Sequence, residues 1–212
     1  MDIVVNILTV IGALFVLLIL WAVWGASRRS RTPEARAADA AAAAAKRDAD
    51  AALPAGWSLS EADRERYGAG AHGVNAYGTV AQGPGGERFV AIALSKAEAY
   101  RAALRAVRGE LSAAQAWAAP VPALPAGAKA DPSVDPDEDI EVPLPADWTL
   151  LAVDYESYYT GEQSLPTYGA MAVGPGGKRA LAVTRDRDRA VASLVDCIEG
   201  RLRVTDAWAF QL

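Results

Sequence analysis

The feature that most constrains how this chain folds is an internal repeat. Residues 53–119 align with residues 144–210 at a constant offset of 91 positions, without a gap, and 24 of the 67 aligned residues are identical. The matches include a Leu-Pro-Ala-x-Trp opening, a Gly-Pro-Gly-Gly turn and a closing Ala-Trp-Ala. Self-similarity at a fixed period is typical of a duplicated structural unit. The sequence therefore predicts two tandem copies of one small domain, at 53–119 and 144–212.

Each copy is expected to be an α+β unit in the order β-β-β-α. Two short strand-like runs flank the Gly-Pro-Gly-Gly sequence, which indicates a β-hairpin because glycine supplies the positive φ of such turns. A helix follows, with Ser95 and Glu98 as a capping box in the first copy and Asp186 at the equivalent N-cap in the second. Apolar residues then recur at helical spacing. The alternation of the apolar residues Leu202 and Val204 indicates a possible final β-strand in the second copy.

The segment between the copies, residues 120–143, is predicted to be a linker. It contains six prolines, six acidic residues and only one lysine. A proline-rich segment with charges of one sign stays extended and solvated, because it cannot bury enough apolar surface to offset the entropy lost on ordering.

Residues 3–24 carry no charged side chain and predict a transmembrane helix behind a short tail, residues 1–2. Twenty-two residues at 1.5 Å each span about 33 Å, enough for a hydrocarbon core of about 30 Å. A cleaved signal peptide would need a basic start and a small-residue cleavage site, which are missing. The lipid bilayer is therefore an expected partner. Five residues are expected at the membrane interface: Trp21, Trp24, Arg28, Arg29 and Arg31.

The arginines after residue 24 also set an expected orientation, because basic flanks stay on the cytoplasmic side. The N-terminus is then outside and the C-terminal domains are cytoplasmic. Residues 25–52 form a basic flank and an alanine-rich stalk, in which Thr32 and Pro33 are typical of a helix start. This helix lacks large apolar side chains, so we expect a spacer with little to bury.

Composition excludes several kinds of site. One cysteine and one histidine cannot form a disulfide framework or a Cys/His zinc site. A formal charge of −5 argues against a general nucleic-acid binder. The G-x-G-x-x-G match at 68–73 is expected to be a loop, because the preceding segment is charged and not a buried strand. We predict no catalytic, cofactor-binding or metal-ligating residue.

Aromatic and acidic residues recur in both copies. We expect the repeated aromatic residues to form the core of each copy; the alternative is that they form a ligand-binding surface. Asp63 and Asp154 recur together with Glu65 and Glu156, and we interpret them as a solvated face, with acid–base chemistry as the alternative. The candidate binding-surface residues are Trp57, Tyr77, Trp117, Trp148, Tyr168 and Trp208.

From these patterns we expect a non-enzymatic, single-pass membrane-anchored adaptor whose two α+β modules bind a protein partner. Two linked modules gain avidity without new contacts. Two alternatives stay open. One is an outward-facing cell-envelope or phage-related module that binds glycan through its tryptophans. The other is a weak hydrolase that uses Asp63 or Asp154.

Overall fold

The computed structural model describes residues 32–68, 73–119, 121, 123, 143–160 and 163–211. Residues from Ala42 onward form one compact unit, which contains both repeats. Of the unit before it, residues 1–41, only the start of a helix is described. Most of the predicted linker, namely residues 120, 122 and 124–142, lies outside the described residues.

The prediction of a membrane anchor is corrected. Within the part of the chain that the structure describes, no helix is long and apolar enough to cross a membrane. The longest one, α2, begins with Pro33 and otherwise consists of alanine and charged residues. The segment for which the span was predicted, residues 3–24, and its expected interface residues lie outside the described ranges. The single-pass topology and the cytoplasmic placement that followed from it therefore lose their support.

Helix α2 (Pro33–Ala52) begins and ends where the sequence predicted a helix. The Thr32 hydroxyl caps its start by accepting a hydrogen bond from the backbone N–H of Ala35 at 3.2 Å. The expectation that this helix has little to bury is wrong for its second half. Ala45 and Ala49 pack in one cluster with the side chain of Tyr100. Small side chains at helical spacing let this half of α2 lie close against the first repeat.

Two antiparallel sheets form the body of the protein. Sheet 1 contains β1 (Ser58–Leu59), β2 (Asp63–Tyr67), β3 (Val74–Gln82), β4 (Arg88–Ala93) and β9 (Ala207–Gln211). Sheet 2 runs in the order β5 (Ala116–Ala119), β8 (Arg179–Thr184), β7 (Gln163–Val173) and β6 (Thr149–Thr160). The predicted hairpins are β3–β4 and β7–β8, and the second turns through a short 3-10 helix, η2 (Pro175–Gly177).

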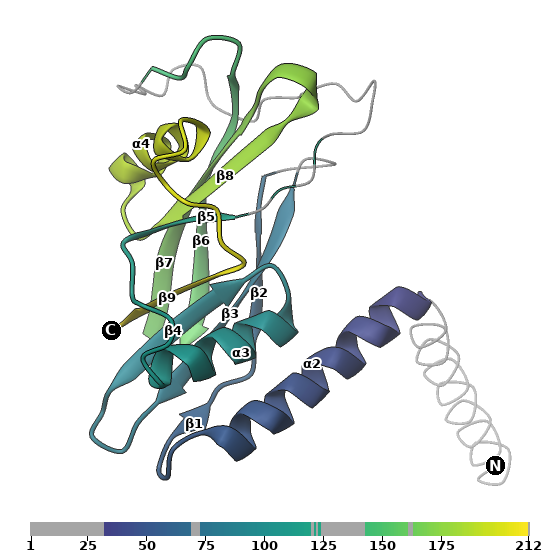
Figure 1. Cartoon of the computed structure of the whole chain (residues 1–212), viewed down its shortest axis with the longest axis vertical. Helices are drawn as coiled ribbons and strands as arrows, with labels where there is room; N and C mark the ends of the chain where they lie inside the picture. The colour runs from purple at the N-terminus through teal and green to yellow at the C-terminus, as the bar shows by residue number, and fades with distance from the viewer. Residues whose placement is uncertain are drawn as a thin grey trace, which may run out of the picture. The chain divides into compact units, whose positions relative to one another are not determined.

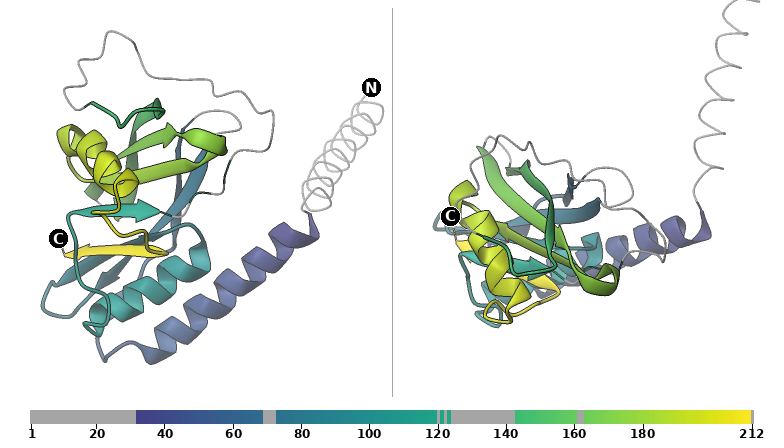
Figure 2. Two further views of the ribbon diagram at one scale, coloured as in Figure 1. Left: turned by 45° about the horizontal axis from the view of Figure 1, so that its top comes forward. Right: turned by 90° about the horizontal axis from the view of Figure 1, so that it is seen from above.

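The last strand of each repeat belongs to the sheet of the other repeat. Strand β9 pairs with β4, so that Ala209 lies opposite Ala91, and β5 pairs with β8, so that Ala118 lies opposite Ala182. The two pairings are equivalent, because the repeat offset of 91 residues relates Ala91 to Ala182 and Ala118 to Ala209. In Figures 1 and 2 the yellow β9 lies alongside β4, while β5 lies beside β8. The two predicted tandem copies are therefore not separate domains, because each completes the sheet of the other with its last strand.

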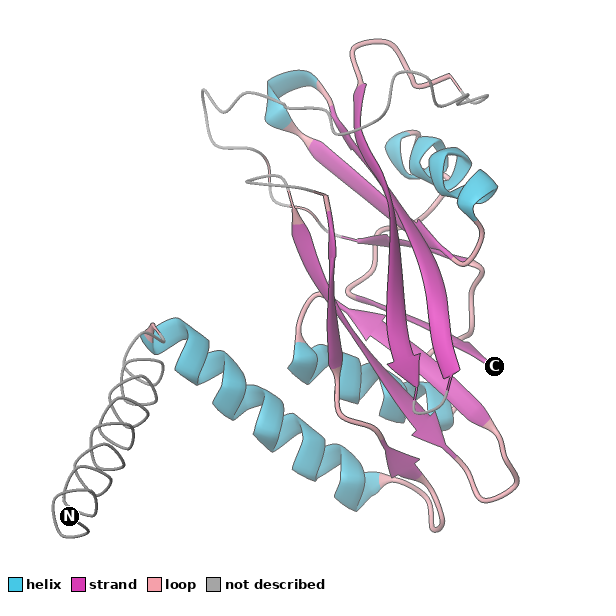
Figure 3. Ribbon diagram, turned by 180° about the vertical axis from the view of Figure 1, so that it is seen from behind, coloured by secondary structure: helices cyan, strands magenta, loops and turns pink. Residues whose placement is uncertain are grey.

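The helices predicted after each hairpin cover the outer faces of the sheets. Helix α3 (Lys96–Val107) lies on sheet 1 and α4 (Arg187–Ile198) lies on sheet 2 (Figure 3). Ser95 and Asp186 cap them as predicted, by accepting hydrogen bonds from the backbone N–H groups of Glu98 and Asp188. The helix–sheet layers are rich in alanine, whereas larger side chains fill the layer between the sheets. The buried residues of that inner layer are Tyr67, Ala76, Val80, Val90, Ile92, Trp117, Ala119, Leu151, Tyr158, Leu165, Met171, Leu181, Val183 and Trp208.

Candidate functional site

Two of the six predicted surface aromatics are core residues. Trp117 and Trp208 are 1% and 2% exposed and lie between the two sheets. Each indole N–H donates to a backbone carbonyl of the opposite repeat at 2.8 Å, Trp117 to Thr205 and Trp208 to Ala114. Buried in this way, neither indole is available to a ligand.

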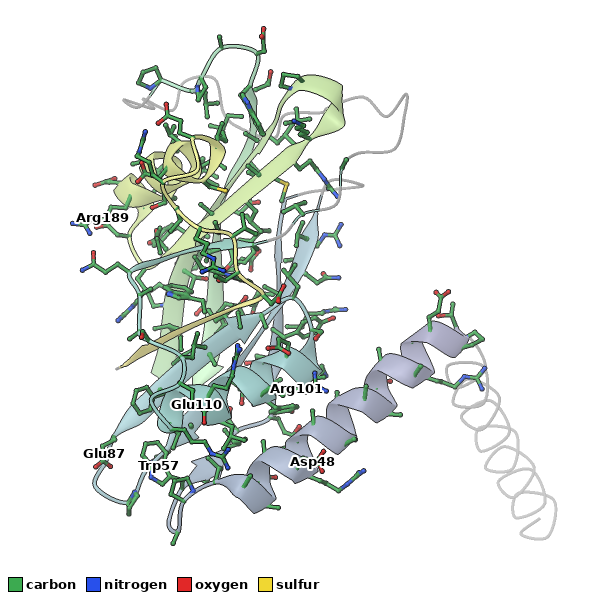
Figure 4. The ribbon with its side chains drawn as sticks, in the orientation of Figure 1. Asp48, Trp57, Glu87, Arg101, Glu110 and Arg189 are labelled. Carbon is green, nitrogen blue, oxygen red and sulfur yellow. The ribbon has the colours of Figure 1, made fainter. Side chains whose placement is uncertain are left out.

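Trp57 and Trp148 are half-buried beneath the two Gly-Pro-Gly-Gly turns. Trp57 stacks on Phe89 with a centroid separation of 5.8 Å. A Cβ at Gly83 would lie 2.8 Å from the Trp57 indole, and one at Gly174 would overlap Trp148. The glycine at the start of each turn therefore allows the tryptophan indole to pack directly against the turn backbone. Figure 4 shows Trp57 and Glu87 at this end of sheet 1.

Tyr77 and Tyr168 both pack, half-buried, into the helix–sheet layers of their own repeats. Tyr168 has a partner that the sequence did not single out. The ring of Tyr155 meets it edge-on at a centroid distance of 5.3 Å, and Tyr155 is 56% exposed. We call Tyr155 and Tyr168 the edge aromatic pair, because Tyr155 lies on β6, the last strand of sheet 2.

The repeated carboxylates are partly exposed and lie on the inward faces of two strands from different sheets. Tyr67 and Tyr158 are buried between the sheets, and alternation along a strand places every second residue on the same face. The inward faces of β2 and β6 therefore carry Asp63 and Glu65 on one side and Asp154 and Glu156 on the other. These two strands pack against each other. We call the four carboxyl groups the acidic seam.

The centre of the acidic seam is the pair formed by Glu65 and Glu156, which are equivalent residues of the two repeats. The pKa of Glu156 is raised to about 7, first by burial, then by a hydrogen bond with Glu65, and then by the negative charges of Glu65 and Asp154. A carboxylate has no proton to donate, so a hydrogen bond between two carboxyl groups requires that one of them is protonated. The raised pKa of Glu156 therefore favours a protonated carboxyl group in this pair up to about neutral pH.

Further contacts join the repeats around this pair. The backbone N–H of Gly68 donates to the carboxylate of Asp154. The Tyr67 hydroxyl is 2.5 Å from that of Thr167, and burial raises the pKa of Tyr67 far above its usual value. The Tyr158 hydroxyl is buried near that of Tyr67, but no hydrogen bond of ordinary geometry joins it to any described residue. The cause is a difference between the repeats, since the position equivalent to Thr167 is Ala76.

The glycines opposite these tyrosines allow the sheets to approach. A Cβ at Gly78 would lie 2.6 Å from the ring of Tyr158, and one at Gly169 would overlap the ring of Tyr67. Gly78 and Gly169 are equivalent residues, so each repeat provides a glycine on which the tyrosine of the other repeat rests. This reciprocal packing places the acidic seam at an approximate twofold axis between the repeats.

Among the described residues, no group of three or more His, Cys, Asp or Glu side chains is arranged to hold a metal ion. His72 lies outside the described residues. Cys197 is half-buried on α4, and burial raises the pKa of its thiol. Cys197 is not part of the acidic seam.

The sequence pointed to Tyr168 but not to Tyr155. The repeat alignment gave no signal for Tyr155, because its equivalent in the first copy is Arg64. The aromatic pair therefore occurs in one repeat only. Comparisons of the chain with models of protein families, with curated proteins and with solved structures found no match.

Proposed function

We propose that this protein is a non-enzymatic interaction module that binds an extended segment of a partner protein along β6. The observation that carries the proposal is the edge aromatic pair, with Tyr155 exposed on the last strand of sheet 2. The backbone N–H and C=O groups at an open sheet edge can pair with an added strand. Exposed tyrosine is a residue type that contributes strongly to protein–protein binding.

The two repeats differ at this edge in a way that supports the choice of β6. In the first repeat the edge is divided between β1, with two residues, and β2, with five. The outward residue there is the exposed Arg64, and the second half of α2 packs nearby through Ala62. Short strands, charges and covering helices are the ways in which proteins protect a sheet edge. Strand β6 has twelve residues, with Tyr155 in place of the arginine.

Glycan binding by an aromatic platform is less well supported. Stacking on a sugar requires accessible ring faces, and Trp117 and Trp208 are buried with their N–H groups already bonded. The exposed aromatic surface at Tyr155 is small and lies beside main-chain groups that suit a peptide.

The test compares Tyr155→Lys with a matched control, Val204→Lys. Tyr155 and Val204 are the large apolar residues that remain exposed in the described part of the chain, at 56% and 46%. Each purified protein is used to capture binding proteins from extracts of the cells that make it, and captured proteins are quantified by mass spectrometry. We expect a specific protein that the wild type and Val204→Lys retain equally and that Tyr155→Lys loses at least tenfold, about 1.4 kcal/mol. Capture that Tyr155→Lys leaves unchanged contradicts the proposal.

A further inference from the structure

We propose that the contact between β2 and β6 is a proton-sensitive switch. While Glu65 and Glu156 share a proton they hold this end of the two sheets together, and once both are ionised they push it apart. This inference concerns the inner face of β6 and does not depend on whether a partner binds at its edge.

The geometry brings together two equivalent carboxyl groups that are far apart in sequence. Glu65 lies on the inward face of β2 with Tyr67, and Glu156 lies on the inward face of β6 with Tyr158. Because β2 and β6 belong to different sheets, the pair lies across the sheet–sheet contact and not within one sheet. Any repulsion between the two groups therefore acts directly on the separation of the sheets.

Among the described residues, the inward strand positions around the pair hold no basic side chain. On β2 these positions hold Asp63 and Tyr67, and on β6 they hold Asp154 and Tyr158. The paired inward positions of the neighbouring strands are uncharged: Val74, Ala76 and Gly78 on β3, and Leu165, Thr167 and Gly169 on β7. Like charges at close range in a partly desolvated site disfavour ionisation of both members.

Two contacts would respond when the pair loses its proton. The Gly68 N–H bond to Asp154 and the hydroxyl contact between Tyr67 and Thr167 both connect the two repeats next to the pair. The first of these contacts ends on Asp154, whose negative charge helps to raise the pKa of Glu156. Opening at this end breaks both contacts and leaves the exchanged strands β5 and β9 in place, since these pair elsewhere in the sheets.

The direction of the pH effect follows from linkage. The pKa of Glu156 is higher in the folded protein, at about 7, than the ordinary glutamic acid value of 4.5. A group with a raised folded-state pKa stabilises the fold fully below its unfolded pKa, and this stabilisation is lost as the pH rises through the folded pKa. The β2–β6 contact is therefore tightest in mild acid and weakens between about pH 5 and pH 8.

The experiment uses the full chain with ¹³C-labelled glutamate and follows side-chain carboxyl shifts by NMR from pH 4 to pH 9. We expect one resonance, assigned to Glu156 by its loss in Glu156→Gln, to titrate with a midpoint near pH 7. Glu65→Gln should move that midpoint down by about one unit or more, a tenfold change in the proton affinity. The matched control is Glu110→Gln, an exposed residue at the end of α3 that is labelled in Figure 4, and it should leave the midpoint unchanged.

A second measurement tests the movement. Amide exchange of β2 and β6 residues, corrected for intrinsic rates, should show protection that falls about tenfold between pH 6 and pH 8 in the wild type. It should stay constant in Glu156→Gln, which has no charge to gain. The proposal is overturned if Glu156 titrates near 4.5 in the wild type, if Glu65→Gln leaves its midpoint unchanged, or if protection of β2 and β6 is the same at both pH values.

Discussion

The indole N–H of Trp117, in the last strand of the first repeat, donates to the backbone carbonyl of Thr205 in the second repeat at 2.8 Å. The same contact occurs in reverse, from Trp208 to Ala114, and the offset of 91 residues relates the two. Backbone bonds between the same segments accompany them, from Thr205 to Ala118 and from Ala114 to Ala209. Each exchanged strand is thus fixed by the chain segment that leads to the other one.

Replacing either tryptophan should destabilise the protein to a similar extent. Trp117→Phe and Trp208→Phe each leave a carbonyl without its donor and a small void, so we expect a loss of about 1–3 kcal/mol in the free energy of unfolding. Trp57→Phe should cost less, because Trp57 is half-buried at the edge of its layer. Urea unfolding monitored by circular dichroism measures all three. A large effect for one buried tryptophan and none for the other would contradict the symmetric arrangement.

The two inner tyrosines should differ despite their equivalent positions. Tyr67→Phe loses the contact with Thr167 and should destabilise the protein by about 1 kcal/mol. Tyr158→Phe removes a buried hydroxyl that makes no hydrogen bond of ordinary geometry with the described residues, so its effect should be close to zero or slightly stabilising. Ala76→Thr should supply the missing partner and make a subsequent Tyr158→Phe substitution costly. Equal losses for the two single variants in equilibrium unfolding would show that the hydroxyls have equivalent surroundings.

A side chain at Gly78 should force the sheets apart. Gly78→Ala places a Cβ 2.6 Å from the Tyr158 ring, and overpacking of this kind costs about 1–3 kcal/mol. The cost should shrink when Tyr158→Ala is already present, because the clash is then absent. A double-mutant cycle of unfolding free energies measures this coupling. If the effects of the two substitutions on the unfolding free energy are additive, the Tyr158 ring does not pack against Gly78.

The second half of α2 should be sensitive on one face only. Ala49 is 2% exposed, whereas Ala51 is exposed. Ala49→Lys buries a charge against the first repeat and should cost about 1–3 kcal/mol or release this half of the helix. Ala51→Lys is the control, since lysine is nearly as good a helix former as alanine. Amide exchange of residues 43–52 distinguishes the two variants, and equal protection in both would show that Ala49 is not packed.

Local structure could be predicted from the sequence, whereas the exchange of strands could not. The starts of α2, α3 and α4 follow from their capping residues Thr32, Ser95 and Asp186, because capping depends on residues close together in the chain. Strands β5 and β9 share the sequence Ala-Trp-Ala, so either would fit beside β4 by side-chain pattern alone. Which copy supplies the strand depends on how the chain runs after α3 and α4, and no local pattern records that.

The carboxylates of the acidic seam were visible in the sequence as a repeat, but their position between β2 and β6 was not. Carboxylates two residues apart usually lie on a solvated strand face, and the sequence offered no sign that β2 and β6 pack against each other. Tyr67 and Tyr158 were the available clue, because a buried tyrosine on the same face implies that the neighbouring Glu65 and Glu156 point inward. Tyr155 could not be found from the repeat, since Arg64 occupies the equivalent position.

The most direct test of the strand exchange is disulfide formation between engineered cysteines in a Cys197→Ser background. Ala91 lies opposite Ala209, and Ala118 lies opposite Ala182. Cysteines at directly opposed strand positions can meet the Cα separation that a disulfide needs. We predict that Ala91→Cys with Ala209→Cys oxidises to an intramolecular disulfide, identified by peptide mass spectrometry. Ala91→Cys with Ala118→Cys, the pair expected if each repeat kept its own strand, should remain reduced. The opposite result, a bond between 91 and 118 and none between 91 and 209, would contradict the exchange and the fold described for this protein.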